Sequence, residues 1–172
     1  MPLIDLEKAE VTCLVDNNVD IPTGISSISG FERSLIAEHG FSVVLKLEIN
    51  GTEHKLLFDS CLSPLAAAHN ADVLDLDLSY CEAVISSHGH IDHAGGLLNI
   101  RKKMNTKEKI PLLLHEHAFK KRLVKFQNGR MIGLPPPTRH LLIQAGYNIV
   151  EQVASSLWIK DRILVTGSTK DN

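Results

Sequence analysis

Four side chains that can bind metal ions lie within six residues of one another. They are His88, His90, Asp92 and His93, in the segment SHGHIDHAGG. Because alternate residues of an extended segment share a face, His88 and His90 can project to the same side. Asp92 and His93, after a turn of the chain, can point towards a second metal position nearby. This spacing suits two metal ions roughly 3.5–4 Å apart that share a water, as in binuclear hydrolases.

The chemistry predicted from these donors depends on metal. Imidazole nitrogens with one carboxylate oxygen favour zinc, as one or two ions, although iron, manganese or cobalt is chemically permitted. Gly89 and the pair Gly95-Gly96 allow tight backbone paths beside the cluster. A lone histidine is usually a packed residue, but four potential ligands so close together favour the metal interpretation.

The segment SHGHIDH resembles the HxHxDH signature of the metallo-β-lactamase fold superfamily. The resemblance implies that His88 and His90 bind one metal ion, and that Asp92 and His93 bind the other. Further segments resemble the branch of dihydropterin-methyl-ribofuranosylaminobenzene phosphate synthase-like metal-dependent hydrolases. These segments are residues 14–17, 38–42, 57–60, 70, 95–97 and 164–167.

The activity that this resemblance implies is hydrolysis of a small molecule of ester, lactone or phosphoester type. Metal lowers the pKa of its bound water to roughly 7, so that a nucleophile is available at neutral pH. Asp92 is the candidate catalytic residue, since it binds metal and can also orient the nucleophile or accept its proton. The loops around such a motif set specificity, so the motif does not name the substrate.

The chain departs from the superfamily pattern in two places. Cys61 stands where the family usually has Gly, and it is interpreted as a small packed residue, with a thiolate near the metal as the alternative. The superfamily fold has two similar αβ halves, and its remaining ligands come from the second half. Residues 1–172 are therefore expected to form a domain that is incomplete at its C-terminus. The alternative function is a truncated or split half-domain, non-catalytic alone, which binds metal weakly and needs a second chain or a second copy.

Four further residues are candidates for supporting the site or contacting the substrate. Asp59 ends a predicted strand, and it could orient a ligand histidine by bonding that histidine's other nitrogen. His39 and Asn17 lie in loops that resemble the branch. His115 follows another predicted strand, with His117 two residues later, and it is a candidate ligand or substrate contact. Each of these residues could instead only shape its own turn or loop.

The elements that would position these residues alternate between strand and helix. Hydrophobic patterning predicts strands over 11–15, 41–49, 54–58, 83–86, 110–114, 147–153, 157–160 and 162–165. It predicts helices over 63–71, 97–103, 116–126 and 138–145, while Asn50-Gly51 predicts a hairpin turn. This order predicts a layered α/β fold with a mixed sheet. The resemblance specifies mainly the N-terminal half of a metallo-β-lactamase-like αβ/βα sandwich.

Composition and charge narrow the class of protein. Hydrophobic residues make up 44% of the 172 residues and the formal net charge is −2, as in ordinary globular domains. No apolar run reaches the ~20 residues of a membrane span. The basic residues between 120 and 125 are interpreted as a solvated helix face, so neither a nucleic-acid nor a membrane partner is expected. Three scattered cysteines indicate a reducing compartment, and we expect a cytoplasmic protein.

Overall fold

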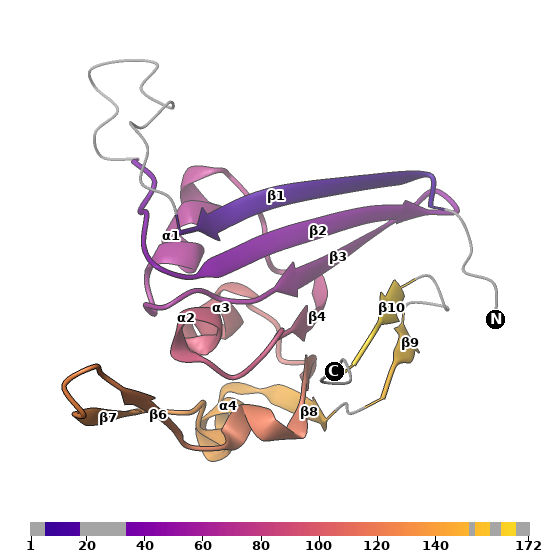
Figure 1. Cartoon of the computed structure of the whole chain (residues 1–172). Helices are drawn as coiled ribbons and strands as arrows, with labels where there is room; N and C mark the ends of the chain where they lie inside the picture. Colours follow the sequence, from indigo (N-terminus) through magenta and orange to yellow (C-terminus); the bar gives the residue numbers. More distant parts are fainter. Residues whose placement is uncertain (1–5, 18–33, 152–153, 159–162, 168–172) are drawn as a thin grey trace.

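A six-stranded sheet is the main feature of the computed structural model, which describes residues 6–17, 34–151, 154–158 and 163–167. Its strands follow the order β1-β2-β3-β4-β5-β8 (Figure 1). They are β1 (Lys8–Asp16), β2 (Phe41–Ile49), β3 (Thr52–Phe58), β4 (Cys81–Ile85), β5 (Ile110–Leu114) and β8 (Tyr147–Glu151). The first three strands pair antiparallel, whereas β3, β4, β5 and β8 are parallel. The predicted α/β fold with a mixed sheet is confirmed.

Short helices and two hairpins surround this sheet. The helices are α1 (Ala66–Val73), α2 (Ile91–Ala94), α3 (Leu97–Lys103) and α4 (Arg139–Ala145), with the 3-10 helix η2 (Glu116–Phe119). The hairpins are β6 (Arg122–Lys125) with β7 (Met131–Leu134), and β9 (Ser156–Trp158) with β10 (Ile163–Val165). No helix in the described ranges is both long and apolar enough to cross a membrane.

The hairpin of β2 and β3 follows from its turn residues. Asn50 and Gly51 have φ angles of 52° and 68°. Two successive residues in this left-handed region match the twist of the flanking strands, and Asn-Gly is the preferred pair for such a turn. The turn pairs Ile49 with Thr52, as the sequence predicts.

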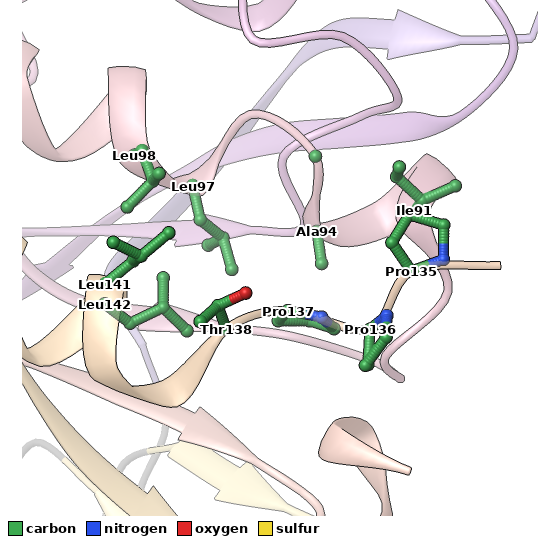
Figure 2. Close-up of a pocket in the computed structure, with 11 residues that line it drawn as sticks. Ile91, Ala94, Leu97, Leu98, Pro135, Pro136, Pro137, Thr138, Leu141 and Leu142 are labelled. Carbon is green, nitrogen blue, oxygen red and sulfur yellow. The ribbon is translucent and has the colours of Figure 1, made fainter. Parts of the chain in front are cut away.

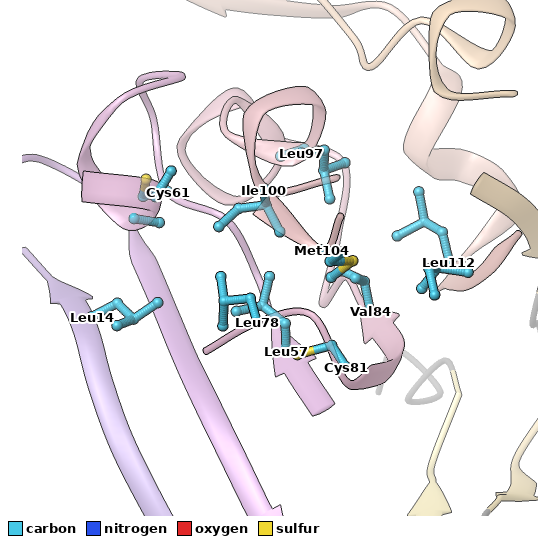
Figure 3. Packing of buried hydrophobic residues seen from close by; sticks show 14 of the residues in the cluster. Leu14, Leu57, Cys61, Leu78, Cys81, Val84, Leu97, Ile100, Met104 and Leu112 are labelled. Atoms are coloured by element: carbon cyan, nitrogen blue, oxygen red, sulfur yellow. The ribbon is translucent and has the colours of Figure 1, made fainter. Parts of the chain in front are cut away.

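The sheet buries apolar side chains on both of its faces. Leu57, Val84 and Leu112 point to one face, where they pack with α1, α3 and α4 in the larger core (Figure 3). Residues next to them in the strands, such as Leu56 and Leu113, point to the other face. There they pack against Trp158, Ile163 and Val165 of the β9–β10 hairpin. Strands buried on both faces explain the nearly continuous apolar runs of β4 and β5.

The helix predicted over 116–126 is wrong. The chain forms only the short η2 there and then turns into β6, which pairs antiparallel with β7. The Asn128-Gly129 turn, with Gly129 at φ 80°, favours a hairpin, and the β-branched Val124 fits a strand better than a helix. The basic residues between 120 and 125 therefore do not form one helix face, and Arg122 is turned back towards the body of the protein.

The parallel strands explain where a site can form. The C-terminal ends of the parallel strands β3, β4 and β5 lie at one edge of the sheet. In open α/β sheets ligands bind at this edge, because the loops after the strands converge there. Asp59, Ser87 and His115 lie in those loops, so residues far apart in sequence meet at one place.

Candidate metal centre

The HxHxDH residues lie in the loop after β4 and in α2. The Nε2 atom of His88 lies 3.0 Å from the Nδ1 atom of His90. The Nε2 atom of His93 lies 3.4 Å from the Oδ2 atom of Asp92. The rings of His88 and His93 approach with centroids 4.2 Å apart. All four predicted ligands are therefore brought together at the edge of the sheet.

Asp59 lies beside this group and contacts the ring of His93. Its carboxylate is only 1% exposed, and its Oδ2 atom lies 2.8 Å from the Nδ1 atom of His93. Ser87 donates its backbone N–H to Oδ1 at 2.8 Å and its hydroxyl to Oδ2 at 2.7 Å. A carboxylate on Nδ1 fixes the tautomer of His93 and leaves Nε2 free to act as a ligand. The structure thus places Asp59 where an orienting residue would lie.

The electrostatics of the site favour neutral imidazole at His88. Burial lowers the pKa of the His88 side chain, and the neighbouring rings of His93 and His90 lower it further. Both effects disfavour the charged form. Neutral imidazole is the form that binds a metal ion, so His88 has the protonation state that a ligand needs.

Close backbone contacts fix α2 on the loop after β3. A Cβ atom on Gly95 would lie 1.8 Å from the carbonyl oxygen of Leu62, and one on Gly96 would lie 2.1 Å from that of Ser60. Gly95 donates its N–H to the carbonyl of Cys61, and Ser60 donates to the carbonyl of His93. Only glycine allows the two segments to approach so closely.

Cys61, for which the resemblance implies Gly, has a backbone conformation that favours glycine. Its φ angle is 59°, in the left-handed region that side chains disfavour. The side chain is fully buried, and burial raises the pKa of the Cys61 thiol to about 12. These observations favour the packed-residue interpretation over a thiolate ligand.

The two candidate loop residues, His39 and Asn17, make different contacts. His39 is exposed, and its Nε2 atom lies 3.2 Å from the Oδ2 atom of Asp92, so it reaches the centre. Asn17 instead accepts the N–H of Gly40 at 2.7 Å through its side-chain oxygen. Asn17 therefore supports the turn next to His39, and no described contact joins it to the four predicted ligands.

A pocket of about 460 Å³ opens beside His88. His115 and His117 also line it, together with Arg122 from β6 and Thr166 from the segment after β10. The rings of His115 and His117 lie 4.6 Å apart between centroids. Small-molecule pockets typically measure roughly 300–1,000 Å³, so this one has room for a substrate next to His88.

A smaller hollow of about 150 Å³ lies behind α2. Figure 2 shows Ile91 and Ala94 of α2 facing Pro135, Pro136 and Pro137, with the leucines of α3 and α4 beside them. Its described lining is almost entirely apolar. Packing of this kind supports the back of the helix that carries Asp92 and His93.

The four predicted ligands form two pairs, and each pair has the spacing of two ligands on one metal ion. Two ligands of one tetrahedral zinc ion lie roughly 3.3 Å apart when zinc–nitrogen distances are about 2.0–2.1 Å. The His88–His90 and Asp92–His93 separations of 3.0 and 3.4 Å are close to this value. Within the described parts of the chain, however, no three or more His, Cys, Asp or Glu side chains are grouped so that they could hold an ion. The residues present therefore supply two partial ligand sets.

Sequence reasoning missed two residues that the structure places at the site. Ser87 bonds Asp59, and its hydroxyl also lies 3.0 Å from the Nδ1 atom of His88. Its position directly before His88, at the end of a buried strand, was the available signal. Arg122 donates to the carbonyl of Gly89, and its place in a basic run concealed that role.

Comparison with known protein families gives one match over most of the chain. A model of the family described as the metallo-beta-lactamase superfamily matches residues 37–159. This range includes all four predicted metal ligands, together with Asp59, His39 and His115.

Two curated relatives come from Methanocaldococcus jannaschii. The 7,8-dihydropterin-6-methyl-4-(beta-D-ribofuranosyl)-aminobenzene-5'-phosphate synthase is 31% identical over 104 residues, which are 60% of this chain and 35% of that protein. An uncharacterized protein is 28% identical over 121 residues, which are 70% of this chain and 43% of the relative. The chain thus spans well under two thirds of the length of either relative.

Solved structures show weaker likeness. A subclass B3 metallo-beta-lactamase from a soil metagenome library is 19% identical, with a TM-score of 0.41 over 70% of this chain and 43% of its own. A quorum-quenching N-acyl homoserine lactone lactonase is 13% identical, with a TM-score of 0.39 over 67% of this chain and 50% of its own.

Proposed function

The chain belongs to the metallo-beta-lactamase superfamily, and we propose that it is a metal-dependent hydrolase acting on a small molecule of ester, lactone or phosphoester type. The superfamily resemblance found in the sequence is confirmed, and so is its likeness to the named synthase. Members of the superfamily generally bind metal ions such as zinc. The substrate, the metal and the reaction of this chain are our proposal.

One observation carries this proposal. Two ligand pairs, His88 with His90 and Asp92 with His93, lie together after β4, and His88 of the first pair lines a pocket of about 460 Å³. We propose that these four residues hold one or two zinc ions, with iron or manganese as the alternatives. A bound ion would supply Lewis acidity and make water a nucleophile at neutral pH.

The chain's own residues have distinct roles in this proposal. Asp92 binds the ion and orients the nucleophile or accepts its proton, and His39 lies within 3.2 Å of its carboxylate. Asp59 orients His93, and Ser87 holds Asp59 in turn. His115 and His117, which line the same pocket as His88, contact the substrate.

Metal content tests the binding part of the proposal. The wild type and the double variant His88→Ala, His90→Ala are dialysed against zinc and then against metal-free buffer. We expect zinc to remain with the wild type and to be strongly reduced in the double variant. His140→Ala, a change in an exposed histidine of α4, is the matched control. Equal and negligible zinc in wild type and double variant would contradict the proposal.

Activity tests the catalytic part. Generic phosphodiester, ester and lactone substrates are assayed with added zinc or manganese, and Asp92→Ala is the control. Hydrolysis above that control supports the proposal, and its absence with all three substrate types counts against it. Because one relative is named a synthase, the assay also scores products in which two substrates are joined.

The alternative is a half-domain that is non-catalytic alone and completed by another chain or a second copy. The absence of a three-ligand group among the described residues favours it. Sedimentation with zinc distinguishes the two proposals. A monomer with full metal occupancy supports the hydrolase, whereas metal binding only in a dimer or in a complex supports the half-domain. The three free cysteines support our proposal that the chain works in the cytoplasm.

A further inference from the structure

Arg122 joins the loop that carries His88 and His90 to the loop that carries His115 and His117. We propose that it is a positioning residue, which fixes the geometry of the first ligand pair from the hairpin that follows η2. This inference rests on the proposed metal site, and it adds a residue outside the HxHxDH motif that determines how well that site is formed.

The guanidinium of Arg122 contacts four carbonyl oxygens of these two loops. Its Nη1 atom donates to Gly89 at 2.9 Å, and to Ala118 and Lys120 at 3.1 Å each. Its Nη2 atom donates to His117 at 2.9 Å. Gly89 is the residue between His88 and His90, so the contact lies at the centre of the ligand pair.

A second, independent contact joins the same two loops. A Cβ atom on Gly89 would lie 2.1 Å from the carbonyl oxygen of Ala118 and 2.4 Å from its Cα atom. The two backbones therefore touch without an intervening side chain. Because carbonyl groups from both loops point at one place, a cation is needed there to offset their mutual repulsion.

The shape of arginine explains why this residue fits. Its planar fork presents several donors in fixed directions, whereas lysine offers one nitrogen on a flexible stem. Hydrogen bonds from a charged donor are also stronger than neutral ones. A lysine here would keep the charge but could not reach both loops in the same geometry. The Gly89 backbone would then turn, and the side chains on either side of it would separate.

The chain contains a matched control in Arg101. Its guanidinium also donates to carbonyl oxygens of separate segments, those of Gly146 at 3.2 Å, Thr106 at 3.0 Å and Glu108 at 2.7 Å. These segments precede β5 and β8, at the opposite edge of the sheet from the site. Arg101→Lys should therefore cost stability without changing the ligand pair.

The experiment compares the full chain with Arg122→Lys and Arg101→Lys, using Co²⁺ as the probe. Co²⁺ affinity is measured by competition with a coloured chelator, and the visible absorption bands report the ligand geometry. We expect Arg122→Lys to bind Co²⁺ at least about tenfold more weakly, as for other residues that orient ligands, and to show shifted bands. Arg101→Lys should stay within about twofold of the wild type, with unchanged bands.

Metal-free protein gives a separate readout. In NMR spectra of the imidazole rings, Arg122→Lys should shift the resonances of His88 and His90, and Arg101→Lys should not. Failure of the wild type to bind Co²⁺ would refute the proposed metal site, while the ring resonances would still decide whether Arg122 positions the two histidines. Wild-type affinity, bands and ring resonances in Arg122→Lys would overturn the inference alone.

Folding failure is also decisive. Arg122→Gln is made in parallel, and circular dichroism is recorded for every variant. If both Arg122 variants fail to fold while Arg101→Lys folds, Arg122 is a structural residue and the positioning role is overturned. If either Arg122 variant folds, weaker Co²⁺ binding with shifted His88 and His90 resonances supports the positioning role. Wild-type affinity and resonances in that variant overturn it.

Discussion

The Nδ1 atom of His93 lies 2.8 Å from the Oδ2 atom of Asp59, although 34 residues separate them along the chain. Asp59 follows β3, and His93 lies in α2 after the neighbouring strand β4. The contact turns the Nε2 atom of His93 towards Asp92. One buried carboxylate thus sets the direction in which a predicted ligand faces.

Replacing Asp59 by Asn should weaken metal binding by roughly ten- to a hundredfold, which is the usual cost of losing a residue that orients a ligand. The amide would put a donor or a weaker acceptor where His93 and Ser87 both need a carboxylate. Competition with a coloured chelator measures the affinity. Asp77→Asn is the control, because that carboxylate is on the surface and bonds only the loop around Ser79 among the hydrogen bonds described. Wild-type affinity in Asp59→Asn would contradict the orienting role.

Replacing Gly95 by Ala should lower the free energy of unfolding by about 1–3 kcal/mol, as for other substitutions that overfill a packed site. The new Cβ atom would lie 1.8 Å from the carbonyl oxygen of Leu62, so α2 would have to move off the loop after β3. Urea unfolding measures the change. Gly133→Ala, whose Cβ atom would meet only Leu123 at 3.9 Å, should cost much less, and an equal loss in both variants would refute this explanation.

Glu38 should stabilise the fold at neutral pH and lose that effect in acid. Burial alone would raise the pKa of this carboxyl, but hydrogen bonds from Ser63, the Cys61 thiol and the Leu62 backbone outweigh it, so the pKa is lowered. The Ser63 N–H donates to Oε1 at 2.7 Å. A carboxyl with a lowered pKa stabilises the folded state above its unfolded pKa, and the effect disappears as pH falls through the folded pKa.

The measurement compares urea unfolding of wild type and Glu38→Gln in the presence of a chelator. The variant should be less stable at about pH 7, and the difference should decrease and vanish as the pH falls through the lowered pKa of the folded Glu38 carboxyl. Glu53→Gln, a change in an exposed carboxylate of β3, is the control. A stability difference for Glu38→Gln that does not change with pH would contradict this prediction.

Only one of the three cysteines should react with iodoacetamide in the folded protein. Burial raises the pKa of both the Cys61 and the Cys81 thiols to about 12, and both side chains are buried. Cys13 is exposed, although burial of its thiol and the nearby Asp16 raise its pKa too. Because the thiolate is the reactive form, Cys13 should label slowly and the others not at all.

Intact-mass spectrometry checks this at about pH 7.5. One adduct should form in the folded chain and three in urea, and Cys13→Ser should show none when folded. Rapid labelling of Cys61 in the folded protein would instead support the thiolate interpretation of that residue.

Much of the fold could be predicted because its signals are local. The strands over 41–49 and 110–114 and the helix over 97–103 were predicted with their observed bounds, since each has its own hydrophobic period. The segment after β5 was not, because it was interpreted as one helix and its turn residues were overlooked. The Asn128-Gly129 turn between β6 and β7 was the local signal for the hairpin that forms instead.

The candidate site was also predictable only in part. The sequence by itself determined the cluster of His88, His90, Asp92 and His93, because four potential ligands within six residues must lie close together in almost any fold. Asp59 could be proposed from its place at a strand end, but not its partner. Only the tertiary structure decided that Asp59 meets His93, that Asn17 supports the turn at Gly40, and that Arg122 bonds Gly89. These contacts depend on the order and register of strands whose ends share one edge of the sheet, and no short stretch of sequence contains that information.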